Sequence, residues 1–312
     1  MKFTFPKDFK FLDLLALARN GRFDPASFRH PLELDFTQLG FAGPGAMACL
    51  KALLAREQHT MPADASFLVE HKSQDAVRYL ERMDFFTKDI RWCMKPTTVN
   101  RYSSEGRFLP MRNLHQLKET DAASLEMVRC LTIADKSDST AFQYVLSELI
   151  DNALQHSDSP TGTFVTAQKY EKLGRVHMLI ADTGIGIRGH LQKNPLYRQI
   201  TEDQSAIQKA LTPFVTGSYK ANPEDILEYD NQGLGLTVSD QIAKRSKGEL
   251  YLWTGRALYR SQTGVTETMP VAWPGTVVYL NLPIKLAVNP TDVVKEFDAQ
   301  LQKPKIQLKF NS

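Results

Sequence analysis

Cysteine is scarce in this chain of 312 residues, which contains only Cys49, Cys93 and Cys130. An odd number of cysteines at long spacings argues against a disulfide framework and against a zinc site, so we expect reduced thiols in the core. The sequence also lacks a run of about 18 apolar residues that could span a bilayer. It opens with MKFTFPKDFKF, which mixes lysines and aromatic residues and does not resemble a secretory signal. We therefore expect a cytoplasmic protein with no membrane partner.

Charge of one sign is also scarce, because the formal net charge is only +3. A balance of this kind gives no clear indication of nucleic-acid binding. Neither a short repeat nor a low-complexity tract is present. With 42% hydrophobic and 23% charged residues, the composition is that of a soluble globular protein, and the length allows two domains that each bury a core.

The first third of the chain predicts a small α/β domain. Residues 32–54 read as an apolar alternation, a Gly-Pro-Gly turn and a helix, and residues 66–86 repeat the order of strand and helix. The stretch that follows, KPTTVNRYSSEG, has no apolar periodicity and reads as a linker. We therefore divide the chain into a domain at 1–96, a linker at 97–110, a second domain at 111–285 and a C-terminal tail at 286–312.

The second domain predicts an α+β fold. We expect helices on one face of a mixed sheet, because helical periodicity and strand-like segments alternate in this region. The predicted helices are residues 122–132, 139–156 and 236–245, and the predicted strands are residues 163–169, 175–181, 249–254 and 276–282. Residues 188–232 are polar and interrupted by three prolines, which is long for a connection and typical of a lid.

The strongest predicted helix carries polar residues that are candidates for chemistry. Glu148, Asn152 and His156 follow one another at intervals of four residues, on a face separate from the apolar stripe. The carboxylate can polarise a water or hydroxyl, and the carboxamide can offer an oxygen ligand to Mg²⁺. A solvated helix face would give the same pattern, so this helix does not decide the matter alone.

Two glycine segments follow this helix. The first, DTGIGI, places Asp182 at the end of an apolar strand, where its carboxylate could accept a hydrogen bond from an amino group. An ordinary turn from strand to loop is the alternative. The second, NQGLGL, leads directly into a helix, whose free N–H groups and dipole favour phosphate. Gly-Leu-Gly alone is weak evidence for such a site.

Together, the three segments resemble the motifs of the GHKL superfamily, which contains the ATP-binding domains of gyrase, chaperones, histidine kinases and MutL. SELIDNALQH resembles the N-box, DTGIGI the first glycine box and NQGLGL the second, and PGTVVYLNLP fits the closing strand. The resemblance covers roughly residues 111–283. It implies a Bergerat-type two-layer sandwich that binds Mg²⁺ and ATP.

The resemblance also implies roles for individual residues. Glu148 would be the general base, Asn152 the Mg²⁺ ligand and Asp182 the acceptor for the adenine amino group. The remaining residues would surround the nucleotide: Gly184 and Gly186 shape the adenine pocket, Gly233, Leu234 and Gly235 offer backbone donors to the phosphates, and Thr276 joins a water network beside the adenine.

By the same resemblance, residues 188–232, including Phe214 and Thr216-Gly217, correspond to the ATP lid. Some family members extend a lysine from elsewhere to the γ-phosphate. Lys220 in the lid is a candidate for this role, although a solvated lysine is the simpler interpretation.

Among the subfamilies, the sequence around Glu148 and Asn152 looks most like the anti-sigma-factor kinases and their histidine-kinase relatives. A conventional histidine kinase needs a phospho-accepting histidine on a helix before the ATP domain. None of the four histidines that precede the N-box has such a setting; they are His30, His59, His71 and His115. We therefore do not expect phosphorylation of a histidine in the same chain.

The first domain has a resemblance of its own. Its LELDFTQLGFAGPGAMACLKALL is similar to the STAS fold of anti-sigma-factor antagonists, in which a strand leads through a turn into an apolar helix. Residues 42–45 read Ala-Gly-Pro-Gly, so the turn offers no hydroxyl for phosphorylation. The resemblance implies a surface for interaction or dimerisation. A small α/β domain without a special role is the alternative.

Three functions are compatible with these features. The chain could hydrolyse ATP slowly and use lid closure to change its contacts with a partner, or it could act in trans as a protein kinase. It could also be a non-catalytic regulator that holds ATP as a structural ligand. We expect a regulatory protein with a protein partner that the sequence does not identify, and homodimerisation remains open.

Overall fold

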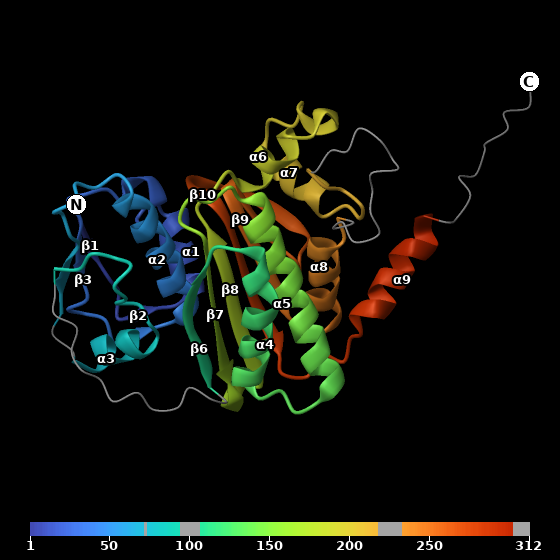
Figure 1. Cartoon of the computed structure of the whole chain (residues 1–312), viewed down its shortest axis with the longest axis horizontal. Helices are drawn as coiled ribbons and strands as arrows, with labels where there is room; N and C mark the ends of the chain where they lie inside the picture. Colours follow the sequence, from blue (N-terminus) through green and yellow to red (C-terminus); the bar gives the residue numbers. More distant parts are fainter. Residues whose placement is uncertain (72–73, 94–106, 218–232, 302–312) are drawn as a thin grey trace, which may run out of the picture.

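The computed structural model describes residues 1–71, 74–93, 107–217 and 233–301 (Figure 1). Lys220, Asn231 and Gln232, together with most of the predicted linker, lie outside these described residues. In the described ranges, no helix is both long enough and apolar enough to cross a membrane.

Strands and helices are interspersed along the chain. The N-terminal elements are β1 (Lys2–Thr4), β2 (Asp8–Phe9), α1 (Phe11–Arg19), β3 (Glu33–Asp35), β4 (Phe41–Ala42), α2 (Pro44–Gln58), β5 (Leu68–Glu70) and α3 (Gln74–Arg82). The elements that follow are β6 (Phe108–Leu114), α4 (Thr120–Leu131), α5 (Lys136–His156), β7 (Thr163–Tyr170), β8 (Arg175–Asp182), α6 (Gly186–Gln192), α7 (Asp203–Ala210), α8 (Gly235–Arg245), β9 (Glu249–Arg260), β10 (Val265–Pro283) and α9 (Pro290–Leu301). Short 3₁₀ helices occupy Pro25–Ser27, Leu117–Glu119, Glu171–Leu173 and Pro195–Tyr197.

The second half of the chain is built on a five-stranded sheet with the order β6-β7-β8-β10-β9. All the predicted helices and strands of this half are present, and the predicted α+β sandwich is confirmed. The prediction of mixed strand directions is wrong for this sheet, because its four pairings are all antiparallel. The physical reason is local: the turn at Glu171–Leu173 makes a hairpin of β7 and β8, and the turn before Val265 makes a hairpin of β9 and β10.

One face of this sheet, which we call the inner face, is covered by α4, α5 and α8 (Figure 1). Alternate residues of β8, namely Val176, Met178 and Ile180, point into the core beneath these helices. The helices contribute apolar stripes such as that of Phe142, Val145 and Leu149 to the same core. This layer holds the polar face of α5 close to the end of β8.

The outer face of the same sheet is covered by the N-terminal unit (residues 1–93), through α1 and α2 (Figure 1). Leu179 and Ala181, which alternate with the inner residues of β8, lie in this second core. The ring of Phe11 stacks on Tyr279 of β10 with their centroids 4.2 Å apart. Every residue of α2 from Pro44 to Leu54 is buried. The five-stranded sheet is therefore enclosed on both faces by this chain.

The N-terminal unit contains a parallel three-stranded sheet, β1-β3-β5, and a parallel pair, β2-β4. Both predicted units of strand and helix are present, and α2 begins with Gly43 at its N-cap and Pro44 at its first position. The similarity to the STAS fold stays a prediction.

Two elements fall in the predicted linker and tail. Strand β6 begins at Phe108, because Phe108 and Leu109 already pair with β7. Helix α9 lies within residues 286–312 and packs against α8, with Val293 buried. Arg245 and Glu296 form a two-pronged ion pair between these helices, at 2.9 and 2.7 Å.

Candidate functional site

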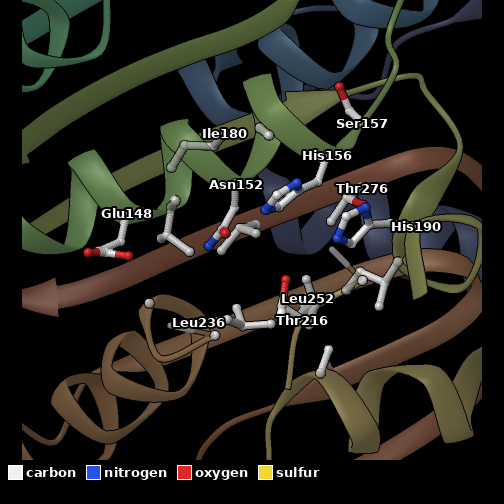
Figure 2. Close-up of a pocket in the computed structure, with 18 of the residues that line it drawn as sticks. Glu148, Asn152, His156, Ser157, Ile180, His190, Thr216, Leu236, Leu252 and Thr276 are labelled. Atoms are coloured by element: carbon white, nitrogen blue, oxygen red, sulfur yellow. The ribbon is translucent and has the colours of Figure 1, made fainter. Parts of the chain in front are cut away.

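A cavity of about 410 Å³ lies between the inner face of the sheet and α5, α6 and α8 (Figure 2). Ligand pockets of enzymes commonly have volumes of roughly 300–1,000 Å³. Eight of the nine predicted site residues line it: Glu148, Asn152, Asp182, Gly186, Gly233, Leu234, Gly235 and Thr276. The exception is Gly184. Residues distant in the sequence therefore come together at one place.

Helix α5 presents its polar face to this cavity. Asp135 caps the helix by accepting a hydrogen bond from the backbone N–H of Asp138 at 2.9 Å. Since the apolar stripe of α5 is fixed in the core, Glu148, Asn152 and His156 line the cavity in succession along the helix (Figure 2). These residues are partly buried, so the alternative of a solvated helix face does not describe their position.

The carboxylate of Glu148 lies against the start of α8. A β-carbon at Gly235 would collide with Oε2 of Glu148, so a larger residue there would displace the carboxylate from its present position. Burial raises the pKa of Glu148, and the negative charge of Asp151 raises it further, while a hydrogen bond with Tyr144 acts in the opposite direction. A carboxylate with a raised pKa is a stronger base than an ordinary surface glutamate.

Asp182 ends β8 and is only 2% exposed. Its Oδ1 accepts a hydrogen bond from the backbone N–H of Gly184 at 2.9 Å. Burial raises the pKa of Asp182 to about 7, although hydrogen bonds from the backbone of Gly184 and Thr276 oppose the shift. A buried carboxyl group of this kind gains from any further N–H donor that enters the cavity.

Two residues that support Asp182 were not predicted from the sequence. Gly275 has φ +93°, and a β-carbon there would collide with Oδ1 of Asp182. The dipeptide Pro274-Gly275 was a usable indication of such a turn. Thr254 donates to the carbonyl of Gly275 at 2.7 Å and accepts from the N–H of Ile187 at 3.2 Å. Nothing in the local sequence singles out Thr254.

Gly184 has a different place from that expected. It lies beside the end of α5, where the N–H of the next residue, Ile185, donates to the carbonyl of Ser157 at 2.7 Å. A β-carbon at Gly184 would collide with that carbonyl. Gly184 therefore fixes the first glycine segment to α5 and does not itself face the cavity.

The second glycine segment forms the start of α8. Leu234 occupies the N-cap position without a side-chain hydrogen bond to the helix, and Gly235 is the first helical residue. Free N–H groups at a helix N-terminus attract anions. This positive end faces the cavity beside Glu148, and phosphate is the ligand that such an arrangement suits.

The described part of the predicted lid, residues 188–217, contains most of α6 and all of α7. Arg188 forms an ion pair with Asp203 of α7 at 3.2 Å, and Asn194 donates to the carbonyl of Thr216 at 3.2 Å. Val215, Thr216 and Gly217 line the cavity. Figure 2 shows Thr216 among the lining residues. Phe214 lies just before them, and its N–H donates to the carbonyl of Gly233 at 3.2 Å.

A pair of histidines also lines the cavity. The imidazole of His156 on α5 stacks on that of His190 on α6, with the centroids 4.0 Å apart and the planes inclined by 23°. His190 was missed because it lies outside all three motifs, in a segment whose sequence shows only a polar lid.

The donors around the cavity suit Mg²⁺ bound together with a nucleotide. Among the described residues, no cluster of three or more His, Cys, Asp or Glu side chains could hold a metal. Mg²⁺ usually takes one or two protein oxygens and completes its octahedron with phosphates and water. Asn152 and Glu148, one helical turn apart on the cavity wall, match that limited requirement (Figure 2).

Comparison with known proteins agrees with the geometry. Residues 137–286 match the family model described as histidine kinase-, DNA gyrase B-, and HSP90-like ATPase. No curated protein and no solved structure matches the chain. The matched segment contains every cavity-lining residue except Val294 of α9.

Proposed function

Because residues 137–286 form an ATP-binding domain of the histidine kinase-, DNA gyrase B-, and HSP90-like ATPase family, we propose that the chain binds Mg-ATP in this cavity and hydrolyses it slowly. Closure of residues 188–232 over the nucleotide would change the contacts of the chain with a protein partner. The observation that carries the proposal is the convergence of eight predicted site residues, from four separate segments, on one cavity.

The base of the nucleotide belongs at Asp182. This carboxyl group is held by the backbone of Gly184 and Thr276, and its burial strengthens the effect of each hydrogen bond it makes. The adenine amino group is a donor and satisfies this acceptor. Guanine carries a carbonyl oxygen at the corresponding position and would face the carboxyl group with a second acceptor.

The phosphates belong at the start of α8. The N–H groups of Gly233, Leu234 and Gly235 lie at the positive end of that helix. Asn152 also lines the cavity and would bind Mg²⁺. Among the described residues that line the cavity there is no lysine or arginine. When bound, Mg²⁺ would supply positive charge to neutralise the phosphates.

We assign to Glu148 the activation of the attacking water. It lies next to Gly235, at the end of the cavity where the phosphates belong, and burial and the charge of Asp151 keep its pKa above the ordinary value. A glutamate in this state accepts a proton from water more readily than one fully exposed. The same group could accept the proton of a protein hydroxyl, which would make the chain a kinase acting in trans.

Incubation with γ-labelled ATP, with and without cell extract, separates these outcomes. Release of free labelled phosphate by the protein alone supports hydrolysis, and labelling of an extract protein supports the kinase. Glu148→Ala should reduce either activity by roughly 10²–10⁴, whereas Glu126→Ala should retain it. Glu126 is a matched control because it is a helical glutamate on the surface of α4, paired with Arg112 at 2.7 Å. Failure to bind ATP would refute the proposal.

A further inference from the structure

The feature that the proposed function leaves unused is His190. Its ring stacks on His156, and the two histidines lie at the end of the cavity away from Glu148, close to Thr276 (Figure 2). The rings come from different elements, α5 and α6, so the stack joins the N-box helix to the helix that begins the predicted lid. Because the centroids are 4.0 Å apart, no base fits between the rings without separating them.

Both ring nitrogens of His190, Nδ1 and Nε2, are buried without a hydrogen-bond partner among the described residues. One face of the ring is covered by His156, and a β-carbon at Gly217 would collide with Nε2. Buried polar groups of folded proteins nearly always have a partner in the protein, in water or in a ligand. Leaving such a group unpaired is unfavourable, so a ligand that supplies a partner gains affinity at this point.

The chemistry of the ring indicates which part of a ligand it suits. Burial lowers the pKa of His190 to about 4, so the imidazole is neutral near pH 7. A neutral imidazole offers one donor and one acceptor. Ring nitrogens, an amino group and ribose hydroxyls complement that pair, whereas a phosphate offers acceptors only. Its position beside Thr276, away from the start of α8, agrees with the nucleoside end of the cavity (Figure 2).

We propose that His190 is a nucleotide-binding residue, which hydrogen-bonds the nucleoside part of the bound nucleotide while His156 holds its ring by stacking. This inference rests on the proposed function, since it requires an adenine nucleotide in the cavity. It assigns a direct contribution to ligand recognition to the part of α6 that follows the first glycine segment.

The test compares three proteins with the wild type by calorimetry, using Mg-ATP, ADP and adenosine. His190→Ala removes the ring, and His190→Phe keeps a stacking ring without nitrogens. His115→Ala is the control, because His115 is an exposed histidine outside the cavity. Both His190 variants should bind all three ligands about 3- to 30-fold more weakly, by a similar factor for each ligand, and the control should bind as the wild type does.

Thermal melting adds a measurement that a structural role would not reproduce. His190→Phe replaces two unpaired buried nitrogens by apolar atoms of similar shape, so the free protein should melt at the same or a higher temperature. The increase in melting temperature on adding ADP should nevertheless become smaller than in the wild type. A residue that only supports the fold would lower the melting temperature of the free protein when it is replaced.

The outcomes distinguish this inference from the proposed function. A wild-type protein that binds no adenine nucleotide overturns both. Wild-type binding with both variants within twofold of it overturns only the role of His190. Weaker binding of ATP and ADP with unchanged binding of adenosine overturns the contact with the nucleoside. If neither variant folds, His190 is a structural residue and the inference is wrong.

Discussion

The indole Nε1 of Trp273 donates a hydrogen bond of 2.9 Å to the backbone oxygen of Asp182. Trp273 lies on β10 and is only 1% exposed, in the core that the sheet shares with the N-terminal unit. The side chain of Asp182 faces the cavity on the other side. One residue therefore contacts the candidate site with its carboxyl group and the outer core with its peptide group.

This contact predicts an optical signal for nucleotide binding. Adding Mg-ATP should change the tryptophan emission, because a ligand on the carboxyl group of Asp182 alters the polarity next to the indole of Trp273. Trp273→Phe should remove most of the change. Trp92→Phe is the control, since Trp92 lies in the N-terminal unit and its Nε1 donates to Thr87 instead. A full signal in the Trp273 variant would show that this contact does not report on the site.

Replacement of Asp182 should weaken the binding of adenine nucleotides. A hydrogen bond to a charged acceptor contributes on the order of 1.5–3 kcal/mol, so Asp182→Asn should lower the affinity for Mg-ATP by roughly 10- to 100-fold. Calorimetry with ATP and GTP checks the assignment, because GTP should bind the wild type poorly. Equal affinities for the two nucleotides would contradict a role for Asp182 in selecting adenine.

The buried carboxyl group also predicts a dependence of stability on pH. The pKa of Asp182 is raised to about 7 in the folded protein, above its ordinary value of 3.8. Its contribution to stability is therefore complete below the lower value and is lost as the pH rises through the higher one. Between pH 6 and pH 8, the unfolding free energy of the wild type should fall by about 1–2 kcal/mol relative to Asp182→Asn.

Urea denaturation of the two proteins at both pH values measures this difference directly. The comparison removes the contribution of the buried histidines, which both proteins share. A difference that does not change with pH would mean that the carboxyl group of Asp182 does not titrate between pH 6 and pH 8 in the folded protein.

The part of the site that was predictable from the sequence is the part that is local. Glu148 and Asn152 belong to one helix, and the two glycine segments each join a strand or loop to a helix, so their spacing is visible in the chain. Gly275, Thr254 and His190 act through contacts made only when β9, β10 and α6 come together. No periodicity or spacing encodes those contacts.

In the fold, too, local elements were predictable from the sequence and contacts between distant elements were not. The elements α4, α5, β7, β8 and α8 were predicted within a few residues, whereas β9 and β10 are longer than the strands predicted for them. The placement of α2 against β7 and β8 was not, because an apolar helix can be buried against any apolar surface. Phe11 and the aromatic residues before it, which mix with lysines in the sequence, form the core on the outer face. The face of the N-terminal unit formed by α1 and α2 is therefore covered by the sheet of the same chain.

Two substitutions on α5 should separate chemistry from binding. Glu148→Ala should reduce phosphoryl transfer by roughly 10²–10⁴, the usual contribution of a positioned acid or base, with nucleotide affinity within a few-fold of the wild type. Asn152→Ala removes a predicted metal ligand, so affinity and turnover should both fall, and excess Mg²⁺ should restore part of the loss. Normal turnover by Glu148→Ala would contradict its role as general base.

The last prediction concerns coupling between the candidate site and the N-terminal unit. An ATP analogue that resists hydrolysis should protect residues 188–217 from hydrogen exchange more than ADP does, because only the analogue has a γ-phosphate to contact the lid. Smaller protection should reach α2, which packs against β7 and β8, the strand that ends at Asp182. Exchange measured in the free, ADP-bound and analogue-bound states tests both expectations.

The controls follow from the same contacts. Helix α3 does not contact the five-stranded sheet as extensively as α2 does, so its exchange should change less. Trp273→Phe should weaken the response of α2 while leaving the protection of residues 188–217, because it removes the indole that joins the backbone of Asp182 to the outer core. Equal lid protection in all three states would contradict a switch driven by ATP. A ligand shifts a conformational equilibrium only through different affinities for its two states. Protection of the lid without any change in α2 would therefore mean that the states distinguished by the nucleotide differ only within the nucleotide-binding domain.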